Sequence, residues 1–307
     1  MIRMKARVTD DEPTIDDVGQ VSGAAARPRV ISAGSALREA MRAAQFAGRT
    51  VGLVPTMGAL HAGHLSLVDA SRAECDVTVV SIFVNPTQFS PHEDFDAYPR
   101  DLRRDLALLG ERGCDLAFTP SVQEMYPLGD GTSVDVGPIA EALEGEYRPN
   151  HFRGVATVVL KLFQLAPADY AYFGRKDYQQ TLVVEQMVAD LNVPTEIRVL
   201  PTIREPDGLA MSSRNAYLSP DERRRAVALG ESLRLAERLA DQGERDVAAI
   251  RGQMAQLIGQ RGGVDVQYLA FVADGTVTPV KSINGPTVVA IAAKVGNTRL
   301  IDNTLIG

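Results

Sequence analysis

The sequence predicts an α/β protein in which a Rossmann-like, doubly wound parallel sheet is followed by a smaller α+β domain. Apolar, β-branched runs alternate with helical patterns through the first part of the chain, which is typical of right-handed βαβ units and a sheet covered on both faces. A second, helix-rich part begins after Arg214. The chain has 307 residues. A chain of this length exceeds the size at which a single hydrophobic core normally stops growing, so we expect two domains.

Apolar runs and helical spacing predict the elements of the first domain. Strands are expected over 51–54, 77–84, 116–118 and 170–173, and a helix over about 65–71. A further helix is expected to start near Pro99, with Leu102, Leu106 and Leu109 on its inner face. Ligands of such sheets bind beyond the carboxyl ends of the strands, where the loops converge.

The second domain is predicted to begin with a capped helix. Ser219-Pro220-Asp221-Glu222 places a capping serine, a proline at the first helical position and a glutamate at the third, before a helix that runs toward Asp241. Arg223, Arg224 and Arg225 are interpreted as a solvated helix face rather than a phosphate-binding patch. Strands over 264–272 and 287–293, bounded by Gly or Pro turn signals, complete the domain.

These elements divide the chain into three parts. Residues 1–29 mix acids, bases, Pro and Gly without periodicity, which predicts a disordered extension. Residues 30–205 form the expected catalytic domain and 206–307 the smaller domain, with the turn Pro206-Asp207-Gly208 at the boundary.

Composition excludes several classes of function. The net charge of -7 argues against a broad nucleic-acid surface. Cys75 and Cys114 lie neither in a Cys-x-x-Cys pair nor beside a histidine, and are interpreted as buried thiols in a reducing cytosol. No apolar run approaches the roughly 20 residues that span a bilayer, and no signal-peptide pattern is present. We expect a cytoplasmic protein with neither nucleic-acid nor membrane partners.

The most informative motif is the segment from Pro55 to His64. Gly58 and Gly63 fall in a strand-to-helix turn, where a ligand can approach the backbone and the helix N-terminus offers N–H groups to a phosphate. His61 and His64 are three residues apart with no acid in the motif, which does not match a metal-binding pair. A nucleotide-phosphate site is favoured over a metal site, and a metal site over an isolated capping histidine.

Five further motifs follow in order, and together they indicate the family that this chain resembles. They are Val84-Asn85-Pro86-Thr87-Gln88-Phe89, Tyr98-Pro99-Arg100, His151-Phe152-Arg153-Gly154-Val155, Phe173-Gly174-Arg175-Lys176-Asp177-Tyr178-Gln179-Gln180 and Met211-Ser212-Ser213-Arg214-Asn215. Together with His-x-Gly-His, this set resembles the pantothenate synthetase (pantoate–β-alanine ligase) family of the nucleotidyltransferase superfamily, from about residue 31 onward.

The resemblance implies a reaction in two steps. ATP and pantoate give pantoyl adenylate and pyrophosphate, and the amine of β-alanine then displaces AMP to form pantothenate. It also implies a homodimer, Mg²⁺ bound with ATP, and no tightly bound organic cofactor. Two rival functions stay open: another nucleotidyltransferase acting on a phosphate-bearing acceptor, and a nucleotide-binding module with a dead site.

The expected first step requires fixed positive charge, because the attacking carboxylate and the phosphate are both anions and repel each other. Lys176 and Arg214, with the donors of Ser212, Ser213, His61 and His64, would supply that charge where pyrophosphate leaves. The alternative for Lys176 is an ordinary surface lysine. Gln88 and Gln180 suit a hydroxylated acid because each amide both donates and accepts, although a surface amide is the plainer interpretation.

By resemblance, the site residues extend over several segments. The expected ATP ligands are Met57, Gly58, Ala59, Leu60, His61, Ala62, Gly63, His64, Gly174, Arg175, Lys176, Asp177, Ile203, Met211, Ser212, Ser213 and Arg214, with His64 as the family's proton donor. Gln88 and Gln180 are the expected ligands of pantoate and β-alanine. Asp105 is the expected acid near Mg²⁺, with a solvated helix carboxylate as its alternative.

Two departures from the family pattern are visible. Arg175 stands where the family commonly has Glu, and Asp94-Phe95-Asp96 lies in the loop that begins at Ser90. Neither is expected to touch a residue assigned to chemistry. The smaller domain is expected to act as a lid over the ATP phosphates.

Overall fold

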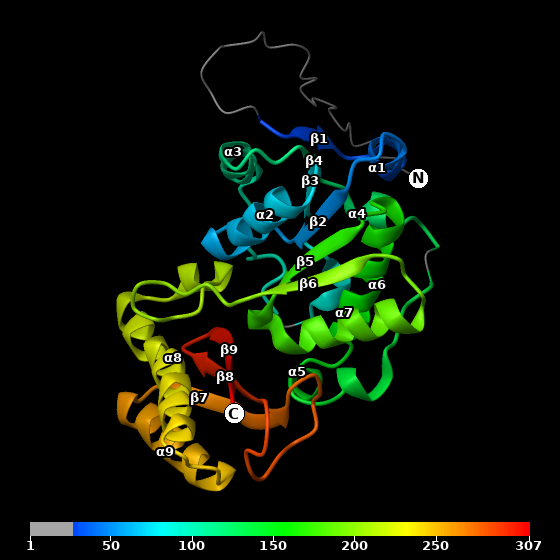
Figure 1. The fold of residues 1–307 in the computed structure, drawn as a ribbon. Helices are drawn as coiled ribbons and strands as arrows, with labels where there is room; N and C mark the ends of the chain where they lie inside the picture. Colours follow the sequence, from blue (N-terminus) through cyan, green and yellow to red (C-terminus); the bar gives the residue numbers. More distant parts are fainter. Residues whose placement is uncertain (1–26, 92, 130) are drawn as a thin grey trace, which may run out of the picture.

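Two sheets form the frame of the molecule (Figure 1). The computed structural model describes residues 27–91, 93–129 and 131–307, so most of the expected N-terminal extension lies outside the described residues. The larger sheet has the order β1-β4-β3-β2-β5-β6 with every pair parallel. Its strands are β1 (Arg29–Ile31), β2 (Val51–Thr56), β3 (Val77–Ile82), β4 (Leu116–Phe118), β5 (Tyr170–Gly174) and β6 (Glu196–Leu200).

The strand order reverses at β2. From this strand, β3 and β4 extend the sheet to one side, and β5 and β6 extend it to the other. In open α/β sheets such a reversal opens a crevice at the carboxyl ends of the two central strands. Those ends are Thr56 and Gly174, and both are followed at once by segments expected to hold ATP.

Helices cover both faces of this sheet, as a doubly wound fold requires. On one face lie α1 (Gly34–Phe46), α6 (His151–Leu165) and α7 (Tyr178–Asp190); on the other lie α2 (Ala62–Glu74) and α3 (Leu102–Glu111). Side chains of β2 alternate accordingly: Leu53 packs with the first group and Val54 with the second. Short elements complete this part: α4 (Val122–Met125), α5 (Glu144–Tyr147), η1 (Pro86–Gln88), η2 (Gly137–Ala140) and η3 (Arg175–Asp177).

The smaller domain packs two helices on an antiparallel sheet. After η4 (Ser213–Tyr217), α8 (Pro220–Asp241) and α9 (Val247–Arg261) cover β7 (Val264–Ala273), β8 (Thr287–Val295) and β9 (Thr298–Ile306). The central strand β8 is buried on both faces. Val289 and Ile291 pack in the domain's own core, whereas Val288 and Ala290 pack with Tyr178 and Leu182 of α7, so an apolar contact joins the two domains.

The predicted fold class is confirmed, and the differences have local causes. The helix expected near Pro99 begins at Leu102, because the Asp101 side chain caps it by accepting from the Arg104 N–H. Leu102 is 43% exposed rather than on the inner face. Strand β1 starts at Arg29, one residue inside the expected extension, and β9 was not predicted.

Two local predictions are confirmed, namely the cap of α8 and the burial of the cysteines. Ser219 and Glu222 form the predicted capping box of α8, and both cysteines are buried and free. Among the three arginines of α8, Arg223 pairs with Glu205 and Asp207, and the other two pair with Asp221. No described helix is long and apolar enough to cross a membrane.

The close approach of α6 to η1 gives a test of this packing. A Cβ at Gly154 would lie 2.4 Å from the carbonyl oxygen of Thr87. In an open helix Gly→Ala is stabilising by about 1 kcal/mol, but overpacking costs about 1–3 kcal/mol. We expect Gly154→Ala to lower the free energy of unfolding, measured by urea denaturation.

A matched control lies in α9. A Cβ at Gly252 would meet no atom within 4 Å, so Gly252→Ala should stabilise the protein by up to about 1 kcal/mol. If both substitutions were equally stabilising, the close contact between α6 and η1 would be contradicted.

Candidate active site

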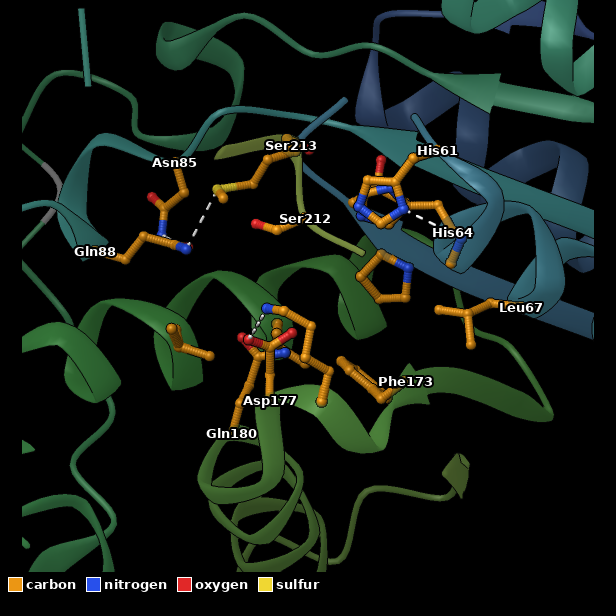
Figure 2. A pocket seen from close by; sticks show the side chains of 18 of the residues that line it. His61, His64, Leu67, Asn85, Gln88, Phe173, Asp177, Gln180, Ser212 and Ser213 are labelled. Atoms are coloured by element: carbon orange, nitrogen blue, oxygen red, sulfur yellow. Dashed lines mark hydrogen bonds and ion pairs between the residues drawn. The ribbon is translucent and has the colours of Figure 1, made fainter. Parts of the chain in front are cut away.

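A cavity of about 210 Å³ opens at the carboxyl ends of β2 and β5 (Figure 2). Its walls bring together most residues expected from the sequence. Those that line it are Met57, His61, Gly63, His64, Gln88, Gly174, Lys176, Asp177, Gln180, Ile203, Met211, Ser212, Ser213 and Arg214. Gly58, Ala59, Leu60, Ala62, Arg175 and Asp105 do not line it.

The turn between β2 and α2 is held in an unusual backbone conformation. Gly58 has φ +80° and Ala59 has φ +50°, a region that a residue with a side chain rarely adopts. The Asp105 carboxylate stabilises this turn by accepting from the N–H of Ala59 at 2.9 Å and of Leu60 at 2.8 Å. Arg104 also donates to the Leu60 carbonyl. Consequently α3 fixes the turn that leads into the two histidines.

These contacts correct the role expected for Asp105. The side chain is 1% exposed, and both oxygens accept backbone hydrogen bonds. Burial raises the pKa of this carboxyl. It is therefore a structural anchor and does not fit a Mg²⁺ ligand, nor is it the solvated helix carboxylate that was the alternative. Within the described part of the chain, no group of three His, Cys, Asp or Glu residues could hold a metal ion.

The two histidines stack on each other at the start of α2. Their ring centroids are 4.1 Å apart (Figure 2). Nδ1 of His61 accepts from the Gly63 N–H at 3.1 Å and so caps the helix, which leaves the ring proton of neutral His61 on Nε2. Nδ1 of His64 is buried without a hydrogen-bond partner among the described residues. A polar ligand atom would satisfy it.

Both rings are neutral in the free protein. Burial, followed by the charge of Lys176, lowers the pKa of His61 from 6.5 to about 4. Burial, His61 and Lys176 hold the pKa of His64 well below its usual value. Each ring therefore offers one N–H donor at neutral pH, and a bound anion would favour the protonated form.

Lys176 follows β5 in η3 and lines the same cavity as these rings. Its side chain is 19% exposed, and its Nζ lies 3.4 Å from the Asp177 carboxylate. That single long contact is the only ion pair of Lys176 among the described residues. The ammonium group thus remains available to a second anion.

The segment that carries Ser212, Ser213 and Arg214 closes the cavity from the other side. The Ser213 hydroxyl donates to the Ala59 carbonyl at 3.1 Å, and the Ser212 hydroxyl caps η4 by accepting from the Arg214 N–H. Arg214 forms a two-point ion pair with Asp94, at 2.9 and 2.7 Å. The expectation that the loop at 94–96 touches no assigned residue is therefore wrong.

Gln88 and Gln180 line the cavity from different elements (Figure 2). Gln88 ends η1, where its Oε1 accepts from Asn85 Nδ2 at 3.0 Å and its Nε2 lies 3.3 Å from the Met57 sulfur. Gln180 lies in the first turn of α7, and its amide makes no hydrogen bond within the described part of the chain. The neighbouring Gln179 is buried, and its amide bonds α5 and η2 instead.

Sequence reasoning missed the residues that support Gln88. His151 Nδ1 lies 2.8 Å from the Gln88 carbonyl oxygen, and Arg148 contacts His151 Nε2 at 3.1 Å while pairing with Glu93. Burial, followed by the charge of Arg148, lowers the pKa of His151 to about 4. His151 belongs to the motif His151-Phe152-Arg153-Gly154-Val155, but no sequence pattern marks its neighbours Glu93 and Arg148 as functional.

The β9 residues Asp302 and Asn303 were also missed. Asn303 Nδ2 donates to the backbone carbonyls of Arg175 and Lys176, and Asp302 pairs with Arg204. Both side chains are buried. Neither lies in a motif that the sequence singled out, and the strand that carries them was not predicted.

Comparison with known proteins agrees with this arrangement. The family model for "Pantoate-beta-alanine ligase" matches residues 29–305. A pantothenate synthetase of Pelotomaculum thermopropionicum is 50% identical over 89% of this chain and 97% of its own length. The crystal structure of pantothenate synthetase from Thermus thermophilus has a TM-score of 0.86 at 46% identity, covering 90% of this chain and 98% of the other.

A third comparison concerns a structure with bound ligands. Pantoate-beta-alanine ligase from Francisella tularensis, complexed with beta-gamma ATP and beta-alanine, has a TM-score of 0.75 at 34% identity, over 91% of this chain and 97% of the other. The family resemblance drawn from the ordered motifs is confirmed. This chain belongs to the pantoate–beta-alanine ligase family.

Proposed function

We propose that this enzyme joins pantoate to β-alanine through a pantoyl adenylate, with release of pyrophosphate and AMP. One observation supports this best. A single cavity at the strand-order reversal brings His61, His64, Lys176 and Arg214 to the same space as Gln88 and Gln180. Cations and N–H donors suit a triphosphate, whereas two amides suit a hydroxylated acid.

In the first step, a carboxylate oxygen of pantoate attacks the α-phosphorus of ATP. A new P–O bond forms as the bond to pyrophosphate breaks, and negative charge accumulates on the leaving group. Lys176, with its one long ion pair, and the N-terminus of α2 would stabilise that charge. Ser212, Ser213 and Arg214 would bind the phosphates from the opposite wall.

The neutral state of the histidines defines their role. His61 and His64 would donate N–H hydrogen bonds to phosphate oxygens first, and transfer a proton second. The buried, unpartnered Nδ1 of His64 supports a direct contact with the nucleotide. Since an adjacent phosphate raises the pKa of an imidazole, ATP would bring both rings closer to protonation.

In the second step, the amine of β-alanine attacks the carboxyl carbon of the adenylate. A C–N bond forms, the C–O bond to AMP breaks, and the amine loses a proton. Gln88 and Gln180 would hold the pantoyl group during both steps. No covalent enzyme intermediate is proposed, and neither cysteine is placed to form one, because both are buried and lie outside the cavity.

Magnesium is proposed to enter as the Mg–ATP complex, because Asp105 is engaged by the backbone. No tightly bound organic cofactor is proposed. A cytoplasmic location agrees with the free, buried thiols. The homodimer implied by the family stays a proposal, which light scattering on the purified protein would test.

Two rival functions are less well supported. A nucleotidyltransferase for a phosphate-bearing acceptor would leave the amides Gln88 and Gln180 without a role. A dead nucleotide-binding module would not require Lys176, Arg214 and both histidines around one cavity. Release of AMP that depends on both pantoate and β-alanine separates the proposed activity from both rivals.

Isotope transfer tests the adenylate. When pantoate carries oxygen-18 in its carboxylate, the oxygen that attacks phosphorus should remain on it after the amine displaces AMP. We therefore expect label in AMP, measured by mass spectrometry. Label in pyrophosphate, or in neither product, would contradict this mechanism.

The charge of Lys176 can be separated from a general structural role. Lys176→Ala should slow adenylate formation about a hundredfold, the scale of losing one oriented donor. Conversion of supplied pantoyl adenylate by β-alanine should change much less, because the activated bond already exists. Single-turnover measurement of each half-reaction checks this.

The control for Lys176 is the exposed Lys281, whose substitution by Ala should leave both half-reactions unchanged. Circular dichroism would establish that both variants are folded. Equal slowing of the two half-reactions in Lys176→Ala would mean that Lys176 organises the whole site, and its proposed specific role would be withdrawn.

The lowered pKa of His61 predicts a pH-dependent loss of stability. As pH falls below 6.5, unfolded His61 binds a proton, whereas folded His61 binds one only near pH 4. Acidification therefore favours unfolding, by up to about 1.4 kcal/mol per pH unit for one proton. We expect His61→Asn, which retains a capping side chain, to lose less stability between about pH 6.5 and about pH 4.

Urea denaturation across that range measures the difference between the two proteins. Above about pH 7 the imidazole is neutral in both states, so the two stability curves should run parallel there. Parallel curves through the acid range as well would show that the pKa of His61 is not lowered by folding.

A further inference from the structure

The backbone of η3, which carries Lys176, is held by a side chain from the other domain. Asn303 of β9 donates from its Nδ2 to the carbonyl of Arg175 at 2.9 Å and to that of Lys176 at 2.8 Å. The residue is 5% exposed. Both N–H groups of one amide thus bind two consecutive carbonyls of a three-residue element.

The backbone of Asn303 is itself held by hydrogen bonds to neighbouring side chains. Its N–H donates to Asp302 Oδ1 at 2.8 Å, and Arg204 binds Asp302 at 2.6 and 3.0 Å. Arg204 also reaches the Asn303 carbonyl at 3.4 Å. Since Asp302 is 3% exposed, this arrangement is largely shielded from water, where hydrogen bonds are strong and their loss is costly.

Arg204 connects the same arrangement to the second ATP-binding wall. It follows Ile203, whose carbonyl accepts from the Met211 N–H at 3.0 Å, and Met211 begins the segment that runs to Arg214. The pair Asp302–Asn303 therefore contacts η3 directly, and through Arg204 it is linked to the segment that begins at Met211. No residue of that pair lines the main cavity.

We propose that Asn303 is a positioning residue for adenylate formation, which acts by fixing the η3 backbone so that Lys176 faces the leaving pyrophosphate. The inference rests on the role proposed above for Lys176. Errors of about 1 Å in the placement of a catalytic group reduce rates by up to about a hundredfold. Asn303 would thus influence the chemistry without touching a substrate.

A double-mutant cycle on the full chain tests this inference. Asn303→Ala should slow single-turnover adenylate formation about tenfold or more, with little effect on conversion of supplied pantoyl adenylate. In a Lys176→Ala background, Asn303→Ala should cause no further slowing, because the group it positions is absent. A general packing defect would instead slow both backgrounds by the same factor.

Two additional variants keep the test decisive. Asn303→Asp has the same shape but lacks both donors, and it enters the same cycle if Asn303→Ala fails to fold. The matched control is Thr304→Val: Thr304 is the next residue of β9, but its hydroxyl bonds Glu237 of α8. Thr304→Val should leave adenylate formation unchanged even where it lowers the melting temperature.

The outcomes separate the inference from the proposed function. Slowing by Asn303→Ala that disappears without Lys176 supports the inference. Normal adenylate formation in the folded Asn303 variants, or slowing that is additive with Lys176→Ala, overturns it alone. Normal adenylate formation in Lys176→Ala overturns the role of Lys176, and the inference with it.

Discussion

The site depends most on the hydrogen bonds that the buried Asp105 carboxylate accepts from the β2–α2 turn. Gly58 and Ala59 adopt left-handed backbone angles, which are unfavourable for alanine and need compensation from the surroundings. Two hydrogen bonds from the turn to one carboxylate provide it, and they tie the β2–α2 turn to α3. Because His61 caps α2 directly after this turn, the direction of both imidazoles follows from the same anchor.

Ion pairs between distant segments determine how charge is arranged around the cavity. Arg214 is held by Asp94, and Arg148 is held by Glu93. Such partly buried pairs contribute little net stability, because desolvation offsets attraction, but breaking one leaves a costly isolated charge. They therefore restrict the cations to fixed positions. Arg148, Lys176 and Arg214 are the cations that line this cavity in the described part of the chain. Of these three, Lys176 has only one long ion pair and is the most available to a substrate anion.

Sequence periodicity was sufficient for the architecture but not for the supports of the site. The apolar runs at 77–84 and 116–118 and the capping box at Ser219 each encode local structure, so β3, β4 and the start of α8 were predicted. The motif residues were likewise found together in one cavity. Asp94, Asp105 and Asn303 depend on partners from 45 to 128 residues away, and no local pattern reports such contacts. Strand β9 was missed because its alternation includes the buried polar pair Asp302–Asn303.

The contact between Asn303 and η3 also constrains the order in which the enzyme matures. During synthesis, domains generally fold from the N-terminus as the chain emerges, so the large sheet can assemble while β9 is still unmade. The carbonyls of Arg175 and Lys176 lack their Asn303 donor until then, because Asn303 follows them by 128 and 127 residues. A nascent chain would consequently acquire its nucleotide fold before its full catalytic competence.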